Sequence, residues 1–142
     1  VGVRHIASQL FDDCQSLTNM MIPNGVLNVE AAAFRDCYSL EKINIPSGVS
    51  SIGDSAFENC KSLKEVSIPD SVLYIGEQAF SGCSSLFSII IPSSVKEIGE
   101  GAFYNCKFSQ QTINDIIERF GNAPFVDVDS KLDSLLKRGI VF

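Results

Sequence analysis

The chain has 142 residues, of which 45% are hydrophobic, and this is enough for a single domain with one continuous core. Seventeen acidic and eleven basic residues give a net charge of -6, and the basic residues are dispersed singly, so a phosphate backbone would be repelled and nucleic acid is not an expected partner. The longest apolar runs, such as Ile89 to Ile91, are far shorter than the roughly 20 residues that cross a bilayer, so no membrane span is expected.

A repeat of 23 residues dominates the sequence. Shifting the chain against itself by this period aligns prolines, phenylalanines and cysteines, namely Pro23, Pro46, Pro69 and Pro92; Phe11, Phe34, Phe57, Phe80 and Phe103; and Cys14, Cys37, Cys60, Cys83 and Cys106. A fixed period of this length is typical of stacked units that bury their apolar side only against their neighbours. The sequence therefore predicts a repeat solenoid with α/β units.

The chain begins within a unit. Five apolar slots of the repeat are filled in this first, partial copy, by Val3, Ile6, Phe11, Cys14 and Leu17. Nothing in the first six residues resembles the polar cap that the end of a solenoid requires. We expect that either further residues precede this edge or another molecule covers it. Residues 1–106 are then a solenoid of five repeats, the first one partial.

Each unit also contains a short run that ends at a proline: Leu17 to Pro23, Leu40 to Pro46, Leu63 to Pro69 and Leu86 to Pro92. Alternating apolar residues followed by a proline, which has no N–H for a sheet ladder, predict a short strand. Four such strands are expected to stack in parallel. The register would set Glu41 beside Lys64 and Lys42 beside Glu65, where opposite charges support the pairing.

The other segments of the unit are expected to form the opposite side of the coil. V-x-x-I-G, as in residues 72–76, is an extended or bridging segment, and A-F-x-x-C, as in residues 56–60, is one helical turn. The residue before each Cys is Asp, Asn or Gly, which are the types that tolerate a left-handed backbone. Phenylalanines and cysteines then form two buried ladders. We expect reduced, space-filling cysteines; a zinc site is the alternative, although stacked rungs do not offer a tetrahedron.

Residues 107–142 predict a degenerate sixth repeat and a helical C-terminal cap of the same domain. Phe108 falls in the Leu slot, and after a deletion of one residue Ile113 to Phe125 overlays the preceding unit. Apolar residues at helical spacing predict a helix from about Thr112 to Phe120, with Gly121 as its stop. A second helix is expected after Asp129 or Ser130, with three leucines facing inward: Leu132, Leu135 and Leu136.

The unit I-P-x-x-V-x-x-I-G-x-x-A-F-x-x-C-x-S-L resembles the BspA-like leucine-rich repeats, which are common in secreted and surface proteins of host-associated bacteria and some protozoan parasites. The resemblance covers Val3 to Cys106 well, with Ser-Leu recurring in four copies such as Ser39-Leu40 and Ser62-Leu63. It implies a curved solenoid with strands on its concave face, turns and single helical turns on its convex face, and roles in adhesion and protein binding at the cell surface or outside the cell.

No catalytic arrangement emerges from the residues, and the resemblance supplies none. The one histidine, His5, lies in an exposed variable slot of the incomplete first unit, and the phosphate-loop, dinucleotide and H-E-x-x-H motifs are missing from the sequence. The acidic residues scatter over variable slots, so no carboxylate pair stands out. We therefore expect neither an enzyme nor a bound cofactor or metal.

The strand slots that face solvent carry a candidate patch for binding a protein. Most of them are polar, but Met21, Phe87 and Ile90 are apolar, and exposed apolar residues on a rigid face mark contact sites. The candidate binding residues are Met21, Asn44, Ser67, Phe87 and Ile90. The alternative for Phe87 is that it packs against the C-terminal cap.

Two functions follow. The first is a protein-interaction or adhesion module that binds a protein ligand, such as a host matrix or cell-surface protein, through the concave face. The second is a structural spacer or self-assembly module, a homo-oligomer joined through the uncapped N-terminal edge.

Overall fold

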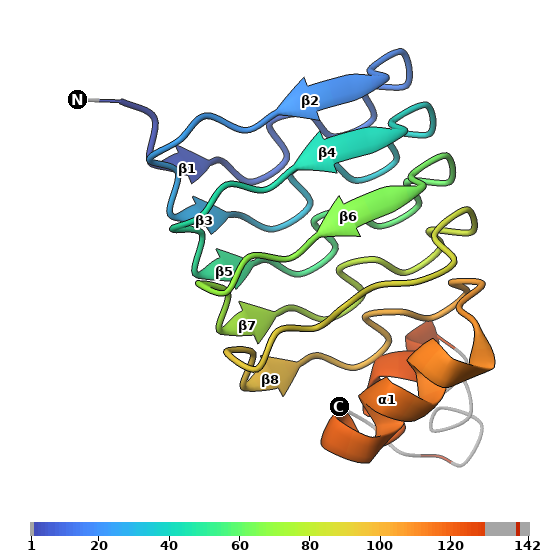
Figure 1. Cartoon of the computed structure of the whole chain (residues 1–142). Coiled ribbons are helices and arrows are strands. Elements are labelled where there is room, and N and C mark those ends of the chain that lie inside the picture. Colours follow the sequence, from blue (N-terminus) through green and yellow to red (C-terminus); the bar gives the residue numbers. More distant parts are fainter. Residues whose placement is uncertain (1, 130–138, 140–142) are drawn as a thin grey trace.

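The computed structural model describes residues 2–129 and 139. The chain coils so that successive turns contribute strands to two parallel sheets, which run down the coil as separate stacks (Figure 1). One sheet has the order β1-β3-β5-β7-β8, with β1 His5–Ile6, β3 Asn28–Val29, β5 Ser51–Ile52, β7 Tyr74–Ile75 and β8 Glu97–Ile98. The other has the order β2-β4-β6, with β2 Asn19–Met21, β4 Lys42–Asn44 and β6 Glu65–Ser67. The predicted solenoid of parallel strands is confirmed.

The register of both sheets follows the repeat. His5 pairs with Asn28, and Lys42 pairs with Glu65, so residues in contact across strands are one period apart. Both predicted pairs are in register, and the Lys64 ammonium lies 3.6 Å from a Glu41 carboxylate oxygen. Both side chains are exposed, where such a pair stabilises by about 0–1 kcal/mol, so these charges support the register rather than create it.

The prediction of a fourth strand between Leu86 and Pro92 was wrong. This run follows the same path but forms no strand, and no backbone hydrogen bond joins it to β6 in the described part of the chain. Its carbonyl groups bond to the C-terminal cap instead. The Phe87 carbonyl accepts from the Ser109 N–H at 3.0 Å, and Arg119 donates to the Ile91 and Pro92 carbonyls at 2.6 and 2.9 Å.

The V-x-x-I-G runs form more than the expected bridging segments, because they make the longer of the two sheets. Glycine follows β5, β7 and β8, whereas Ala7 and Glu30 occupy the same slot after β1 and β3. These glycines do not have a left-handed backbone, but a side chain there would meet the preceding turn: a Cβ on Gly99 would overlap the Glu77 nitrogen. Successive turns therefore touch backbone to backbone at this corner.

The A-F-x-x-C segment is a run of tight turns rather than a helix. The N–H groups of Ser55, Phe57 and Asn59 donate to carbonyls of the next turn, at 2.7–2.8 Å, while those of Ala56 and Cys60 bond three residues back. The predicted left-handed residue before each Cys is confirmed, from φ 59° at Asp36 to 78° at Gly82. A second left-handed position, four residues earlier, was not predicted; it falls on Gln9, Ala32, Ser55, Gln78 and Gly101.

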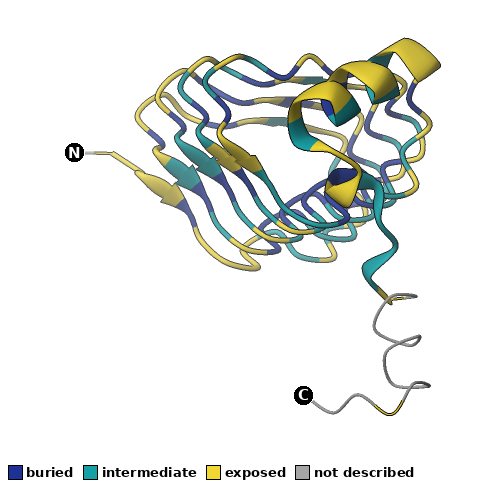
Figure 2. Cartoon of the chain, turned by 90° about the horizontal axis from the view of Figure 1, so that it is seen from below, coloured by how far each residue is buried: buried dark blue, intermediate teal, exposed yellow. Residues whose placement is uncertain are grey.

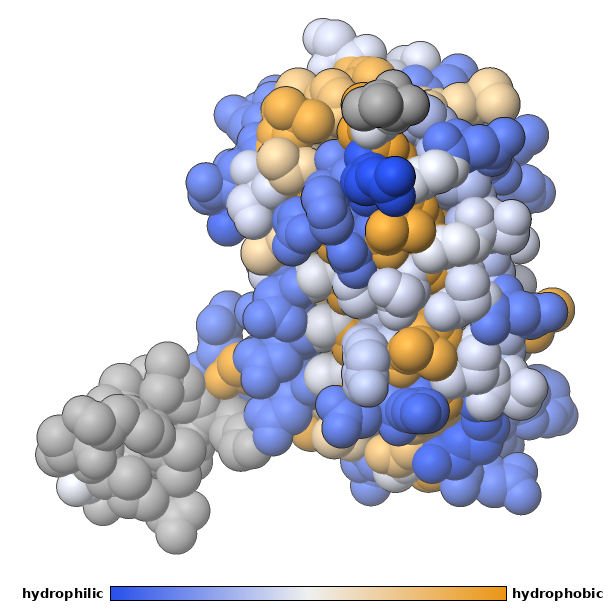
Figure 3. Space-filling model, turned by 90° about the vertical axis from the view of Figure 1, so that its left-hand side faces the viewer, coloured by the Kyte–Doolittle hydropathy of each residue, from blue (hydrophilic) through white to orange (hydrophobic). Residues whose placement is uncertain are grey.

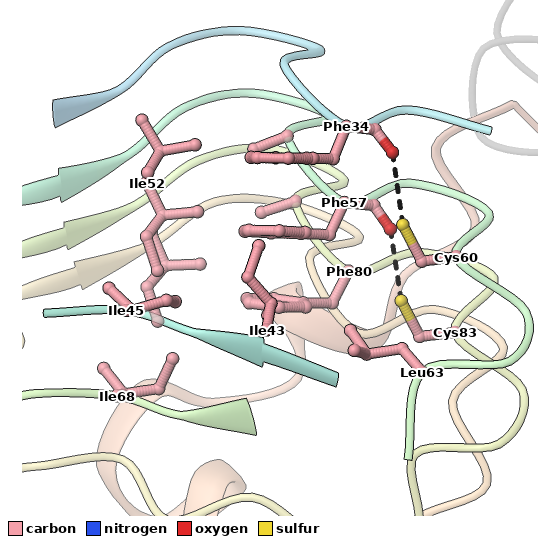
Figure 4. Close-up of a cluster of buried hydrophobic side chains, with 14 of the residues drawn as sticks. Phe34, Ile43, Ile45, Ile52, Phe57, Cys60, Leu63, Ile68, Phe80 and Cys83 are labelled. Carbon is pink, nitrogen blue, oxygen red and sulfur yellow. Dashed lines mark hydrogen bonds between the residues drawn. The ribbon is translucent and has the colours of Figure 1, made fainter. Parts of the chain in front are cut away.

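The core contains the predicted phenylalanine and cysteine ladders, which pack with buried Ile, Val, Leu and Ala side chains (Figure 4). The rings of Phe34, Phe57 and Phe80 are fully buried and stack with centroids 5.2 Å apart and nearly parallel planes. Beside them the four cysteine thiols from Cys37 to Cys106 donate to the carbonyl of a phenylalanine in the preceding turn, as Cys60 does to Phe34 at 3.2 Å. The cysteines are reduced, as expected, but they also act as hydrogen-bond donors and not simply as filler.

The C-terminal end of the stack is covered by α1 Gln110–Phe120 and the short 3₁₀ helix η1 Ala123–Phe125. The predicted helix is confirmed and begins two residues earlier than expected, where the Ser109 side chain accepts from the Thr112 N–H; it ends at Gly121. Figure 2 shows α1, most of it exposed, lying across this end of the coil, and Ile116 is its buried residue. The Phe103 N–H donates to the Pro124 carbonyl, so the segment at η1 continues the ladder of turns.

The second helix, expected after Asp129 or Ser130, lies outside the described residues. The division into residues 1–106 and 107–142 stays a prediction.

The phenylalanine stack generates a test of stability. Phe57→Ala should lower the free energy of unfolding by about 3–5 kcal/mol, because the ring is fully buried between two others and its loss leaves a cavity. Urea denaturation of the purified chain measures this change. Phe87→Ala is the matched control, since that side chain is 64% exposed and should change stability by less than about 0.5 kcal/mol. Equal losses in the two variants would contradict the stacked core.

Candidate binding face

The candidate residues lie on the solvent side of β2, β4 and β6 and of the run 87–91 that follows, which we call the strand face. Here the register aligns Met21, Asn44 and Ser67 as direct neighbours on successive strands. Ile90 is one period beyond Ser67 and continues this row. The structure thus brings four of the five candidates into one row along the axis of the coil, and the repeat period is the reason.

Phe87 lies in a different row, that of Thr18, Glu41 and Lys64. Its backbone carbonyl bonds to the cap, but its side chain is 64% exposed, so the cap does not bury the ring. Met21 and Ile90 are also strongly exposed, at 78% and 85%. The apolar side chains of the face therefore remain accessible to another molecule.

A groove of about 540 Å³ crosses the three strands between two rows of side chains. Asn19, Lys42 and Glu65 line one wall, and Met21, Asn44 and Ser67 line the other. The groove continues as a hollow of about 380 Å³ between β6 and the run 88–92, and then as one of about 180 Å³ between Ile89–Ile91 and α1.

Three wall residues of this groove, Asn19, Lys42 and Glu65, are not in the predicted site. The alternation in the strands predicts their outward position. It does not predict a continuous groove, because a groove depends on the shape of neighbouring turns. The wall carries one positive and one negative side chain, Lys42 and Glu65, in direct register. The strand face therefore has little net charge although the whole chain carries -6.

The chemistry of the remaining polar groups is limited within the described residues. His5 is exposed, with its Nδ1 3.2 Å from the Asn28 amide nitrogen and 3.6 Å from a Glu30 oxygen. In the same part of the chain no group of three or more His, Cys, Asp or Glu side chains could hold a metal ion, and no helix is long and apolar enough to cross a membrane.

The thiols are poorly suited to act as nucleophiles. Burial raises the pKa of Cys37 to about 11 and that of Cys106 to about 12, and it raises the pKa values of Cys60 and Cys83 well above that of an ordinary thiol. Because a thiolate is the reactive form, these side chains are inert at neutral pH.

The strand face also differs from the neighbouring side of the coil. Figure 3 shows the side on which the strands end and the chain turns; hydrophilic areas dominate it, and its hydrophobic areas are small and separate. No comparable row of strongly exposed apolar side chains is expected there, since the turns consist of small polar residues such as Ser47, Asp70 and Ser93.

Comparison with known proteins agrees with the repeat and the fold. The family described as the BspA type leucine rich repeat region matches residues 4–131 in six copies. The chain belongs to this BspA-type leucine-rich repeat family. No curated protein sequence is significantly similar to it.

Solved structures of bacterial leucine-rich repeat proteins are similar to the chain. A leucine-rich repeat protein of T. pallidum is 35% identical over 77% of this chain and 51% of its own, with a TM-score of 0.75. One from Bacteroides ovatus ATCC 8483 is 36% identical over 73% of this chain and 28% of its own, with a TM-score of 0.69. A leucine-rich cell surface protein of Faecalibacterium prausnitzii A2-165 is 32% identical over 75% and 35%, with a TM-score of 0.62. The chain thus spans about half or less of each.

The buried thiols generate a prediction about pH. Unfolded thiols ionise from about pH 8.5 to 9, whereas the folded thiols keep their protons to higher pH, so the unfolded state binds fewer protons there. The stabilisation is fully present below pH 8.5 and is lost as pH rises toward 11. Each fully buried thiol should contribute a fall of about 1.4 kcal/mol per pH unit to the free energy of unfolding.

Urea denaturation between pH 8 and 11 measures this slope. Because lysines and tyrosines titrate in the same range, the control is a Cys60→Ala, Cys83→Ala double variant, whose curve should fall less steeply. Parallel curves for the two proteins would show that these thiols do not carry the effect.

Proposed function

We propose that the chain is a protein-interaction or adhesion module of a secreted or cell-surface protein and that it binds a protein ligand through the strand face. The observation that carries this proposal is the row of exposed side chains, apolar at Met21 and Ile90, held in register on a rigid repeated frame. Family membership supports a role in binding, and the F. prausnitzii relative is described as a cell surface protein.

The physical basis is the contrast between frame and face. The repeated Phe, Cys and Leu side chains are buried in the stack and cannot touch a ligand, so recognition depends on the outward slots that differ from turn to turn. A rigid face loses little conformational entropy on binding, and its exposed apolar groups gain most from being covered. Phe87 and Ile90 lie on the same turn and form the larger apolar area.

Binding tests the proposal. A pull-down with a panel of host matrix and cell-surface proteins should first identify a ligand. A Phe87→Ser, Ile90→Ser double variant should then bind this ligand at least tenfold more weakly, because two apolar contacts are lost. Surface plasmon resonance measures the change. Tyr74→Ser is the matched control: Tyr74 is 44% exposed, on the five-stranded sheet, and its loss should leave affinity unchanged. Unchanged affinity in the double variant would refute the site.

The alternative function, a structural spacer or self-assembly module joined through the N-terminal edge, is favoured by one observation. Val3 and Leu10 are each 54% exposed at this edge, and Phe11 below them is only partly buried. The backbone of the edge limits the partner, however. By analogy with the next turn, where Ala31, Ala33 and Arg35 accept from the turn before, the Ser8, Leu10 and Asp12 carbonyls face outward.

Two copies meeting at this edge would therefore oppose acceptors to acceptors along the turn, so backbone hydrogen bonds could join them only at the strands β1 and β2. Apolar side chains such as Leu10 would supply the rest of the contact. Sedimentation velocity from 1 to 100 µM distinguishes the functions. Self-assembly predicts a mass that rises with concentration and returns to that of the monomer in a Leu10→Glu variant. A constant monomer mass would exclude assembly through this edge, and the binding proposal would be unaffected.

A further inference from the structure

The charged side chains of the strand face alternate in sign. Lys42 and Glu65 are direct neighbours on β4 and β6, and the Lys64 ammonium lies 3.6 Å from a Glu41 carboxylate oxygen. Each of these four exposed charges therefore has an opposite charge beside it on the neighbouring turn. Together they sum to zero, whereas the whole chain carries -6. Two copies of the chain repel each other on average, and the strand face is a surface on which they can meet without that repulsion.

The pattern on this face is complementary to itself. A second copy can be placed against the first by a two-fold axis that runs parallel to the strands, midway between β4 and β6. Such a rotation leaves each residue at the same position along its strand and reverses the order of the turns. β4 of one copy then lies opposite β6 of the other, and β2 lies opposite the run 87–91.

Opposite charges meet throughout this arrangement. Glu41 of one copy lies opposite Lys64 of the other, and Lys42 lies opposite Glu65, because the members of each pair occupy the same slot on neighbouring turns. The two-fold axis repeats each contact, so the pairing of opposite charges is complete between the copies. Complementary charges of this kind favour one orientation of the partner and reject others.

The uncharged side chains match in the same arrangement. Met21 lies opposite Ile90, and both are strongly exposed apolar side chains. Asn44 lies opposite Ser67, and a side-chain amide can donate to a hydroxyl or accept from it. The contact at Met21 does not require the run 87–91 to be at strand spacing from β6, because a flexible thioether side chain fills an irregular gap. Burial of these apolar groups supplies the attraction that exposed ion pairs lack.

The C-terminal cap does not separate two such faces. Figure 1 shows α1 at the C-terminal end of the coil, past the run 87–91. Because the axis reverses the coil, α1 of one copy lies beyond β2 of the other. The face itself is small, since β2, β4 and β6 have three residues each, and it offers less than the roughly 800 Å² that each partner buries in a standard stable complex. The dimer should therefore be weak.

We propose that the strand face binds the strand face of a second copy of the chain, with the two coils running in opposite directions and with Glu41 and Lys42 of each copy paired to Lys64 and Glu65 of the other. This inference rests on the proposed function, because it uses the same face, and it specifies a partner. It differs from assembly through the N-terminal edge, which involves none of these side chains.

Two variants with opposite changes of charge test the pairing. Lys42→Glu sets two glutamates against each other across the axis, and Glu65→Lys sets two lysines against each other, so each variant alone should associate at least tenfold more weakly than the unchanged chain. An equimolar mixture of the two should associate about as strongly as the unchanged chain, because opposite charges then meet at both contacts. Sedimentation velocity from about 10 µM to 1 mM measures the mass.

The matched control is Lys61→Glu. It changes the charge by the same amount at an exposed position outside the strand face, and its association should equal that of the unchanged chain. All three variants concern exposed residues and should fold, which circular dichroism checks.

The outcomes separate this inference from the function on which it rests. A monomer at every concentration would overturn the inference and leave the proposed function standing, because a ligand can bind the face of a monomer. A dimer that persists in both variants, or a mixture of the variants that stays monomeric, would also overturn it. If Phe87→Ser, Ile90→Ser abolishes self-association but leaves the affinity for the ligand found by pull-down unchanged, the proposed function fails and the inference stands.

Discussion

The transfer of backbone hydrogen bonds from each turn to the next is the constraint on which the rest of this structure depends. Alternate N–H groups of the turn around each phenylalanine donate to the following turn, and the N–H groups between them bond within their own turn. This pattern needs left-handed residues such as Ser55 and Asn59, each of which costs about 1 kcal/mol or more in strain. The inter-turn bonds and the buried ring stack offset that cost only because every turn repeats the same conformation.

The same ladder explains the role of the cysteines. The carbonyls of the four ladder phenylalanines from Phe11 to Phe80 already accept from a backbone N–H three residues on. The second lone pair of each takes the thiol of the cysteine in the next turn, as at Phe57 with Cys60 and Cys83. A small side chain with a weak donor suits this position, since a larger one would clash and alanine would leave the carbonyl with one partner. The thiols therefore help to align successive turns and do not serve as redox groups.

Binding and stability are separated in this molecule. The ladders of phenylalanine and cysteine fix where each turn lies, and the strand face receives its geometry from them without contributing to the core. A row such as Met21, Asn44 and Ser67 can thus vary in chemistry while its spacing stays fixed at the distance between strands. A face of this kind suits a ligand whose contact groups are spaced by the distance between strands. The chemistry of each contact can differ from turn to turn.

The sequence by itself determined the period, the inward and outward slots, and the phenylalanine and cysteine ladders. It also determined the left-handed residue before each cysteine and the helix that ends at Gly121. Each of these features depends on local residue type and spacing. Only the tertiary structure decided which runs pair as strands. Residues 86–92 have the same pattern as their three predecessors, yet their carbonyls bond to Ser109 and Arg119 of the cap, a contact between segments that no local pattern contains. The groove between Lys42 and Asn44 was likewise beyond the sequence, since its depth depends on how neighbouring turns stack and on which side chains the cap leaves exposed.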